Sequence, residues 1–215
     1  MALPLPLRNR LADLILDALH DQGARRGLEA LAAVCADPAA LDRTDPPRAF
    51  PTELFDRRAD GWRIKPGFRD HGAALGDRAA RAVRALASRP FSAADPPLEV
   101  TLGEAAVLFG AGLYFEVHEM LEPYWMRADG AERQALQGLI QVAVGFQHLA
   151  NRNLDGARAL LREGVAKLAG QGLAGRELDD FARRVDRCRR DVVDLGAEAA
   201  TGFDWSTVPP FPAER

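Results

Sequence analysis

The sequence is poor in cysteine, and its two cysteines do not form a recognisable motif. Cys35 and Cys188 lie far apart, with neither a Cys-x-x-Cys pair nor a neighbouring Cys/His pair. Disulfide-stabilised domains and cysteine-based metal sites need closely spaced or more numerous cysteines. We therefore predict two free, mostly buried thiols rather than one disulfide bond.

The sequence also lacks long apolar runs and a strong net charge. No apolar stretch approaches the roughly 20 residues that a membrane-spanning helix needs, so we expect no membrane insertion. The formal net charge is −3, which argues against general nucleic-acid binding. Pro4 and Pro6 interrupt the first residues, where a signal peptide requires a continuous apolar helix. These absences together predict a cytoplasmic protein.

What is present is the composition of a folded globular chain. Of the 215 residues, 47% are hydrophobic and 27% are charged, which excludes a disordered or collagen-like protein. The length fits one domain of ordinary size, or one domain with an appended segment.

Apolar residues recur at three- and four-residue spacing in the N-terminal part, which predicts helices over 7–21 (ended at Gly23), 26–36 and 77–88. Residues 37–76 contain many prolines, and we predict an irregular segment with one helical turn near 53–56. The aromatic residues of this segment predict that it packs on the body of the domain: Phe50, Phe55, Trp62 and Phe68.

The C-terminal part shows a stronger helical pattern, over residues 101–110, 114–126, 131–150, 154–169 and 176–196, followed by an extended tail. Segments 111–121 and 150–160 align at an offset of 39, and each reads as a helix end, a tight turn and an amphipathic helix. We therefore predict an all-α fold, a compact helical bundle of stacked helix-turn-helix pairs. Residues 1–98 would form a helical and irregular extension packed on a core domain of residues 99–215.

Two smaller patterns in the C-terminal part have structural interpretations. The apolar residues of 176–196 form a near-heptad stripe, which predicts either a homodimer or packing within the chain. Gly170, Gly172 and Gly175 spell a GxGxxG motif, but they follow a helix where a dinucleotide-binding fold has a strand. We interpret them as a helix stop and a loop.

The residues with chemical potential lie on two neighbouring helices. His118 and Glu122 are one helical turn apart, and Trp125 lies seven residues past His118 on the same face. The apolar segment 131–150 carries a stripe of polar residues at spacings of four and seven. Because a buried polar group without a partner costs about 1–3 kcal/mol, we expect the polar residues of both helices to converge. The predicted network or pocket consists of Glu116, His118, Glu119, Glu122, Trp125, Gln137, Gln141 and His148.

Three interpretations of this network remain open. In the first, His118, Glu122 and His148 bind one divalent metal ion and Glu119 activates a water molecule. This pattern departs from the zincin His-Glu-x-x-His motif, because Glu122 stands in place of the second histidine. In the second, the residues form a purely structural hydrogen-bonded network. In the third, they line a metal-free pocket for a small-molecule ligand whose identity the sequence does not indicate.

Residues 101–170 also contain a dense set of motifs: Phe109-x-x-Gly112-x-Tyr-Phe-Glu116-x-His118-Glu119-x-x-Glu122-x-x-Trp125, then Gln137-Gly-Leu-Ile-Gln141, and later His148, Asn153, Gly156-Ala157 and Leu160-Leu161. This set resembles the domain of unknown function 309 family. The resemblance implies an all-helical fold, and members are often labelled predicted metal-dependent hydrolases. Two functions therefore stay open, a metal-dependent hydrolase and a non-enzymatic helical-hairpin interaction or scaffold module.

Overall fold

The structure is a computed structural model that describes residues 2–41 and 45–214. The chain divides into two compact units, unit 1 (Met1–Asp95) and unit 2 (Pro96–Arg215). Each unit has its own set of packed helices. The predicted packing of the N-terminal extension on the core domain stays a prediction.

The described residues of unit 1 form three α-helices, α1 (Leu5–Asp17), α2 (Gln22–Ala36) and α3 (Gly72–Leu86). The side chain of Asp21 accepts a hydrogen bond of 2.7 Å from the Ala24 amide and caps the start of α2. Gly23, which we predicted as the end of the first helix, therefore lies in the first turn of the second. The prediction was wrong there because the capping signal of Asp21 outweighs the weak helix propensity of glycine.

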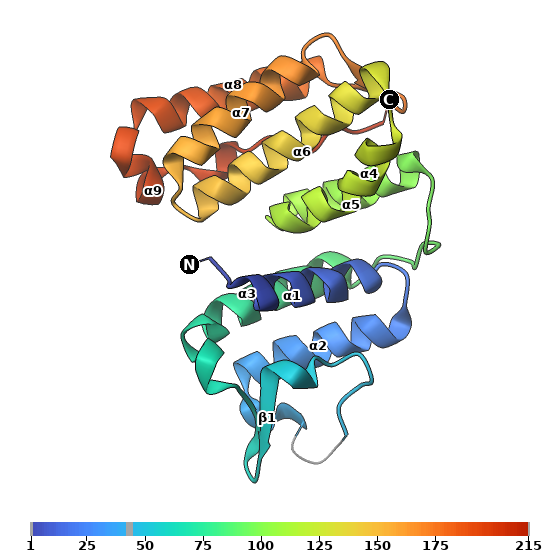
Figure 1. The fold of residues 1–215 in the computed structure, drawn as a ribbon, viewed down its shortest axis with the longest axis vertical. Coiled ribbons are helices and arrows are strands. Elements are labelled where there is room, and N and C mark those ends of the chain that lie inside the picture. The colour runs from blue at the N-terminus through green and yellow to red at the C-terminus, as the bar shows by residue number, and fades with distance from the viewer. Residues whose placement is uncertain (1, 42–44, 215) are drawn as a thin grey trace. The chain divides into compact units, whose positions relative to one another are not determined.

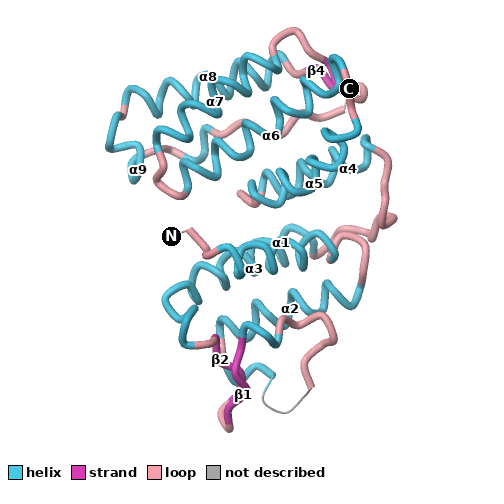
Figure 2. Tube along the Cα trace, in the orientation of Figure 1, coloured by secondary structure: helices cyan, strands magenta, loops and turns pink. Residues whose placement is uncertain are grey.

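Between α2 and α3 the chain forms a β-hairpin that the sequence analysis missed (Figure 2). Strands β1 (Phe55–Arg58) and β2 (Gly61–Ile64) pair antiparallel, with Phe55 opposite Ile64. Three 3-10 helices surround the hairpin: η1 (Pro38–Leu41), η2 (Thr52–Leu54) and η3 (Pro66–His71). Strands of four residues are too short to show a clear alternation, so the segment appeared irregular in sequence. Positions 42–44 of the predicted segment lie outside the described residues.

The aromatic residues of this segment do pack, as predicted. Phe50, Phe55 and Trp62 are buried, and the Phe50 ring centroid lies 5.1 Å from that of Phe55 and 5.4 Å from that of Trp62. Phe68 is half-buried. The hairpin strand β2 contacts α2 and η1, so the aromatic cluster forms part of the core of unit 1.

Unit 2 consists of helices that pack in sequential order (Figure 1): α4 (Leu98–Gly110), α5 (Tyr114–Arg127), α6 (Gly130–Ala150), α7 (Leu154–Leu168), α8 (Asp179–Asp194) and the short α9 (Ala199–Gly202). A second small hairpin, β3 (Gly172–Leu173) with β4 (Arg176–Glu177), separates α7 from α8, and the 3-10 helices η4 (Gly196–Glu198) and η5 (Trp205–Thr207) follow α8. The predicted all-α fold is confirmed, because the strands among the described residues form two small hairpins only. None of the described helices is long and apolar enough to cross a membrane.

The predicted pair of helix-turn-helix units is present, with a shift of one residue. Gly112 (φ 69°) precedes the N-cap Leu113 of α5, and Arg152 (φ 63°) precedes the N-cap Asn153 of α7. Equivalent positions are thus 40 residues apart, one more than the predicted 39. An alignment of the two segments by their apolar residues alone can be displaced by one position, whereas the residue with positive φ in each turn defines the alignment.

Helices α6 and α7 approach closely because glycines line their contact. A Cβ atom on Gly164 of α7 would lie 2.9 Å from the carbonyl oxygen of Gly138 on α6. A Cβ atom on Gly145 would lie 2.8 Å from a methyl group of Leu161. Side chains at these positions would push the two backbones apart.

The near-heptad stripe on α8 is buried within unit 2. Its residues Phe181, Val185, Cys188 and Val192 are at most 4% exposed. The C-terminal segment contributes Phe211, whose ring centroid lies 5.9 Å from that of Phe181. The stripe therefore needs no second chain to cover it. The helix begins at Asp179, three residues later than predicted, because residues 176 and 177 belong to β4.

The GxGxxG glycines form the loop that we predicted, together with the second hairpin. Gly170 and Gly175 both have φ of 73°, as tight turns require. Both cysteines are free, Cys188 buried and Cys35 half-buried, which confirms the prediction of two thiols.

Candidate functional site

Helix α5 positions a histidine and two glutamates on one side of unit 2. The helix starts after the turn at Gly112 and contains Pro123 in its interior. Proline has no amide hydrogen, so the backbone carbonyl of Glu119 lacks its usual helical partner four residues ahead. The chain thus places a helix irregularity directly beside Glu119 and Glu122.

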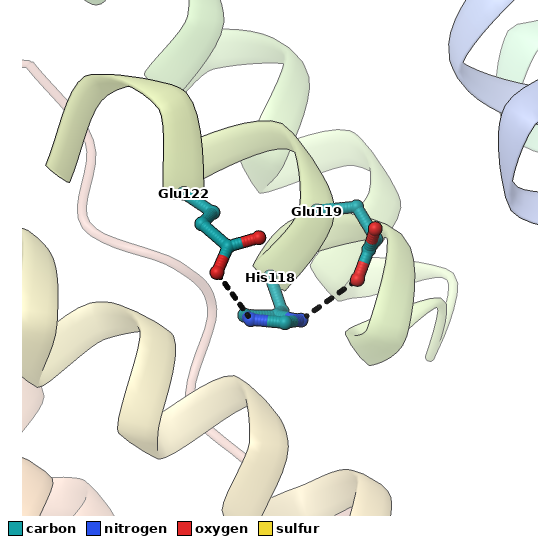
Figure 3. Close-up of side chains that lie close together, drawn as sticks. All are labelled: His118, Glu119 and Glu122. Atoms are coloured by element: carbon teal, nitrogen blue, oxygen red, sulfur yellow. Dashed lines mark ion pairs between the residues drawn. The ribbon is translucent and has the colours of Figure 1, made fainter. Parts of the chain in front are cut away.

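The side chains of His118, Glu119 and Glu122 form a compact group (Figure 3). The Nδ1 atom of His118 lies 3.1 Å from a carboxylate oxygen of Glu119, and its Nε2 atom lies 3.9 Å from a carboxylate oxygen of Glu122. One ligand atom from each of the three residues lies within 4.8 Å of the other two. The imidazole is therefore flanked by a carboxylate on each of its nitrogen atoms.

This group is reachable from solvent and has unused hydrogen-bonding capacity. The side chains of His118, Glu119 and Glu122 are 25%, 37% and 41% exposed. Within the described part of the chain they make no hydrogen bond or ion pair outside the group. A structural network of buried polar groups is normally satisfied by its neighbours. Here the lone pairs of the two carboxylates remain available to a ligand.

Glu116 lies near the start of the same helix and is completely buried. It occupies the first turn of α5, where the helix dipole stabilises a negative charge. Its buried position separates it from the solvent-accessible group at His118, Glu119 and Glu122. Glu116 is therefore best described as part of the helix start.

Gln141 of α6 has its partner on α7. The side-chain amide of Gln141 donates a hydrogen bond of 2.8 Å to the Glu163 carboxylate on α7. Its Oε1 atom is buried and has no partner among the described residues. Gln137 is half-buried and makes no hydrogen bond to a described residue. The convergence that we expected with α5 is not visible in these contacts, because α6 lies between α5 and α7 and directs Gln141 to the far side.

His148 has a partner at the start of α7. Asn153 accepts a hydrogen bond from the Gly156 amide through Oδ1, and its Nδ2 atom lies 2.7 Å from Nδ1 of His148. Because Nδ2 is a donor, Nδ1 of His148 acts as the acceptor, and its lone pair is occupied. Among the described residues, His148 does not belong to the group that can share an ion with His118.

Trp125 lies in the last turn of α5. The guanidinium of Arg133 lies 4.3 Å from the Trp125 ring centroid and donates a hydrogen bond of 2.9 Å to the Trp125 carbonyl. This contact ties the end of α5 to the start of α6. The indole nitrogen is buried without a partner among the described residues.

The sequence analysis missed the partners of these residues. Glu163 and Arg133 lie outside the motifs, and no spacing rule connects them to Gln141 or Trp125. Asn153 has a usable signal, because an asparagine directly before a helix is typical of an N-cap that fixes its own side chain.

Comparison with known proteins adds one result. Residues 102–160 match the family model described as Domain of unknown function (DUF309). Over this segment the predicted resemblance is confirmed. The DUF309 segment includes all of α5 and α6, and hence the whole group of His118, Glu119 and Glu122. No curated protein and no solved structure matches the chain.

Proposed function

We propose that unit 2 binds one divalent cation through His118 and Glu122, with Glu119 supporting the ligand histidine, and that it is a metal-dependent hydrolase. The observation that carries the proposal is the convergence of the three side chains without other described partners. One imidazole nitrogen and one carboxylate, completed by water molecules, are ligands that suit Zn²⁺, Mn²⁺ and Fe²⁺. A bound cation of this kind supplies an acidified water molecule as the nucleophile.

The residues of the group have different roles in this proposal. Nε2 of His118 and the carboxylate of Glu122 face the same region, so both are available to one ion. Glu119 lies at the opposite ring nitrogen, where a carboxylate orients a metal-binding histidine. The remaining coordination positions face solvent, since all three side chains are partly exposed. A hydrolase needs this opening for its substrate.

Titration of the purified protein with Zn²⁺ and with Mn²⁺, followed by calorimetry, tests the binding. The wild-type protein should bind about one ion with a Kd that His118→Ala and Glu122→Gln each weaken by about tenfold or more. His148→Ala is the matched control, because it removes a histidine of the same unit that lies outside the group. Wild-type protein that binds neither ion would refute the proposal, and so would equal loss in the control.

The Glu119→Gln variant tests the role of this carboxylate. In our proposal Glu119 supports the ligand histidine, so the variant should bind the ion more weakly. If it binds the ion normally and loses turnover of p-nitrophenyl esters or phosphates, Glu119 is instead the general base that the sequence pattern suggested. If the wild-type protein binds the ion but hydrolyses none of these probes, the result would support cation binding and contradict the hydrolase activity.

A second candidate function is favoured by the contacts of α6. Gln141 contacts Glu163 of α7, and His148 contacts Asn153, the N-cap residue of α7, so both residues link the two helices of the hairpin. This arrangement suits a non-enzymatic interaction or scaffold module in which polar residues define the helix packing. This alternative would be supported if the purified wild-type protein contains no bound metal and if His148→Ala melts at a lower temperature than the wild type.

A further inference from the structure

Unit 1 contains a cavity that has no part in the proposed cation site. It has a volume of about 240 Å³, and its lining residues belong to the end of α2, η1, the β1–β2 hairpin, η3 and the start of α3. This volume lies just below the range for drug-sized ligands, which is roughly 300–1,000 Å³, so the cavity suits a smaller molecule. The lining residues lie in unit 1 and outside the matched segment 102–160, whereas the group on α5 lies inside that segment.

The walls of the cavity are mainly apolar. Val34, Phe55 and Trp62 are at most 8% exposed, and Ile64 completes this part of the lining. The indole nitrogen of Trp62 is buried and has no hydrogen-bond acceptor among the described residues. A buried N–H group is normally paired, so the wall carries a donor whose acceptor is missing from the described chain.

The charged residues of the lining are arginines. Arg63 forms an ion pair with Asp60, which holds the pKa of the Asp60 carboxyl below its usual value. The side chain of Arg69 is exposed and forms no ion pair or hydrogen bond with a described residue. None of the described residues that line the cavity is acidic. The one lining cation without a described partner is therefore Arg69.

The thiol of Cys35 also lies in the lining and adds no negative charge. Burial raises the pKa of this thiol to about 11, so it stays protonated at neutral pH. The lining thus combines apolar side chains, a tryptophan whose buried N–H has no described acceptor, and an exposed arginine whose side chain has no described partner. An anion with an apolar body complements all three features.

We propose that this cavity binds a small apolar carboxylate. The carboxylate would pair with Arg69, and the apolar body would lie against Phe55, Trp62 and Ile64. A small movement of the side chains that line the cavity would let the carboxylate accept a hydrogen bond from the Trp62 indole N–H. The proposal does not depend on the cation site of unit 2.

Octanoate is a suitable probe, and the full-length protein is the sample. Binding is measured by calorimetry and by the rate at which iodoacetamide alkylates Cys35, read by peptide mass spectrometry. Octanoate should slow the alkylation of Cys35 and leave that of Cys188 unchanged, because Cys188 lies in unit 2. 1-Octanol and octylamine have the same chain without the negative charge, and both should bind more weakly.

The Arg69→Gln variant tests the recognition of the anion. It should weaken octanoate binding by about tenfold, the change expected from losing one charge-assisted hydrogen bond. Arg48→Gln is the matched control, because Arg48 is an exposed arginine of unit 1 outside the cavity lining. Octanoate that fails to protect Cys35 would overturn the proposal. Equal binding of octanoate and octanol, or equal effects of the two variants, would overturn it as well.

Discussion

The close contact of α6 and α7 predicts that Gly164→Ala destabilises unit 2. The new methyl group would lie 2.8 Å from a methyl group of Val142, 2.9 Å from the Gly138 carbonyl oxygen and 3.1 Å from the Val142 amide nitrogen. Two of these atoms belong to the backbone, so a change of side-chain rotamer cannot relieve the overlap. Overpacking of this kind costs about 1–3 kcal/mol.

The same substitution also removes a glycine from a helix, which stabilises by up to about 1 kcal/mol. We therefore expect a net loss of about 1–2 kcal/mol in the free energy of unfolding. Gly103→Ala in α4 is the matched control, because a Cβ atom there meets nothing within 4 Å. That variant should gain about 0.5–1 kcal/mol.

Urea denaturation monitored by circular dichroism measures both variants. The difference between them isolates the cost of the overlap from the gain in helix propensity. If Gly164→Ala is as stable as Gly103→Ala, the two helices are not packed through their glycines, and the reasoning fails.

Three further predictions concern single residues. Gly112→Val should destabilise the protein by roughly 1–3 kcal/mol, because φ is positive at this position. Gly110→Ala should not destabilise it, because a Cβ atom there meets nothing within 4 Å, and thermal melting of the two variants tests the difference. Arg152→Gly should stabilise by about 0.5–1 kcal/mol, since glycine adopts the left-handed conformation without strain, and an unchanged melting temperature would contradict this. Burial raises the pKa of Cys35 from 9.0 to about 11, so the contribution of this thiol to the unfolding free energy should be constant below pH 9 and fall by up to about 3 kcal/mol towards pH 11. Urea denaturation at several pH values should show that Cys35→Ala lacks this share of the fall.

Much of the fold was predictable because helices depend on local information. The apolar spacing of segments 114–126 and 131–150 predicted α5 and α6 to within one residue at each end. Helical periodicity repeats over many residues, so a helix of 14 or 21 residues presents a clear pattern. The hairpin at Phe55–Ile64 has four-residue strands, and its stability comes from burial against α2, which no local pattern reveals.

The candidate site was predictable where its residues lie on a single helix. His118, Glu119 and Glu122 belong to one helix, so their sequence spacing already determined that the first and the last lie one turn apart. The direction in which α6 presents Gln141 and His148 depends on which neighbour each face meets. The sequence identified the polar stripe, and only the tertiary structure decided that it faces Glu163 and Asn153 on α7, since side-chain partners between helices are set by packing and not by spacing.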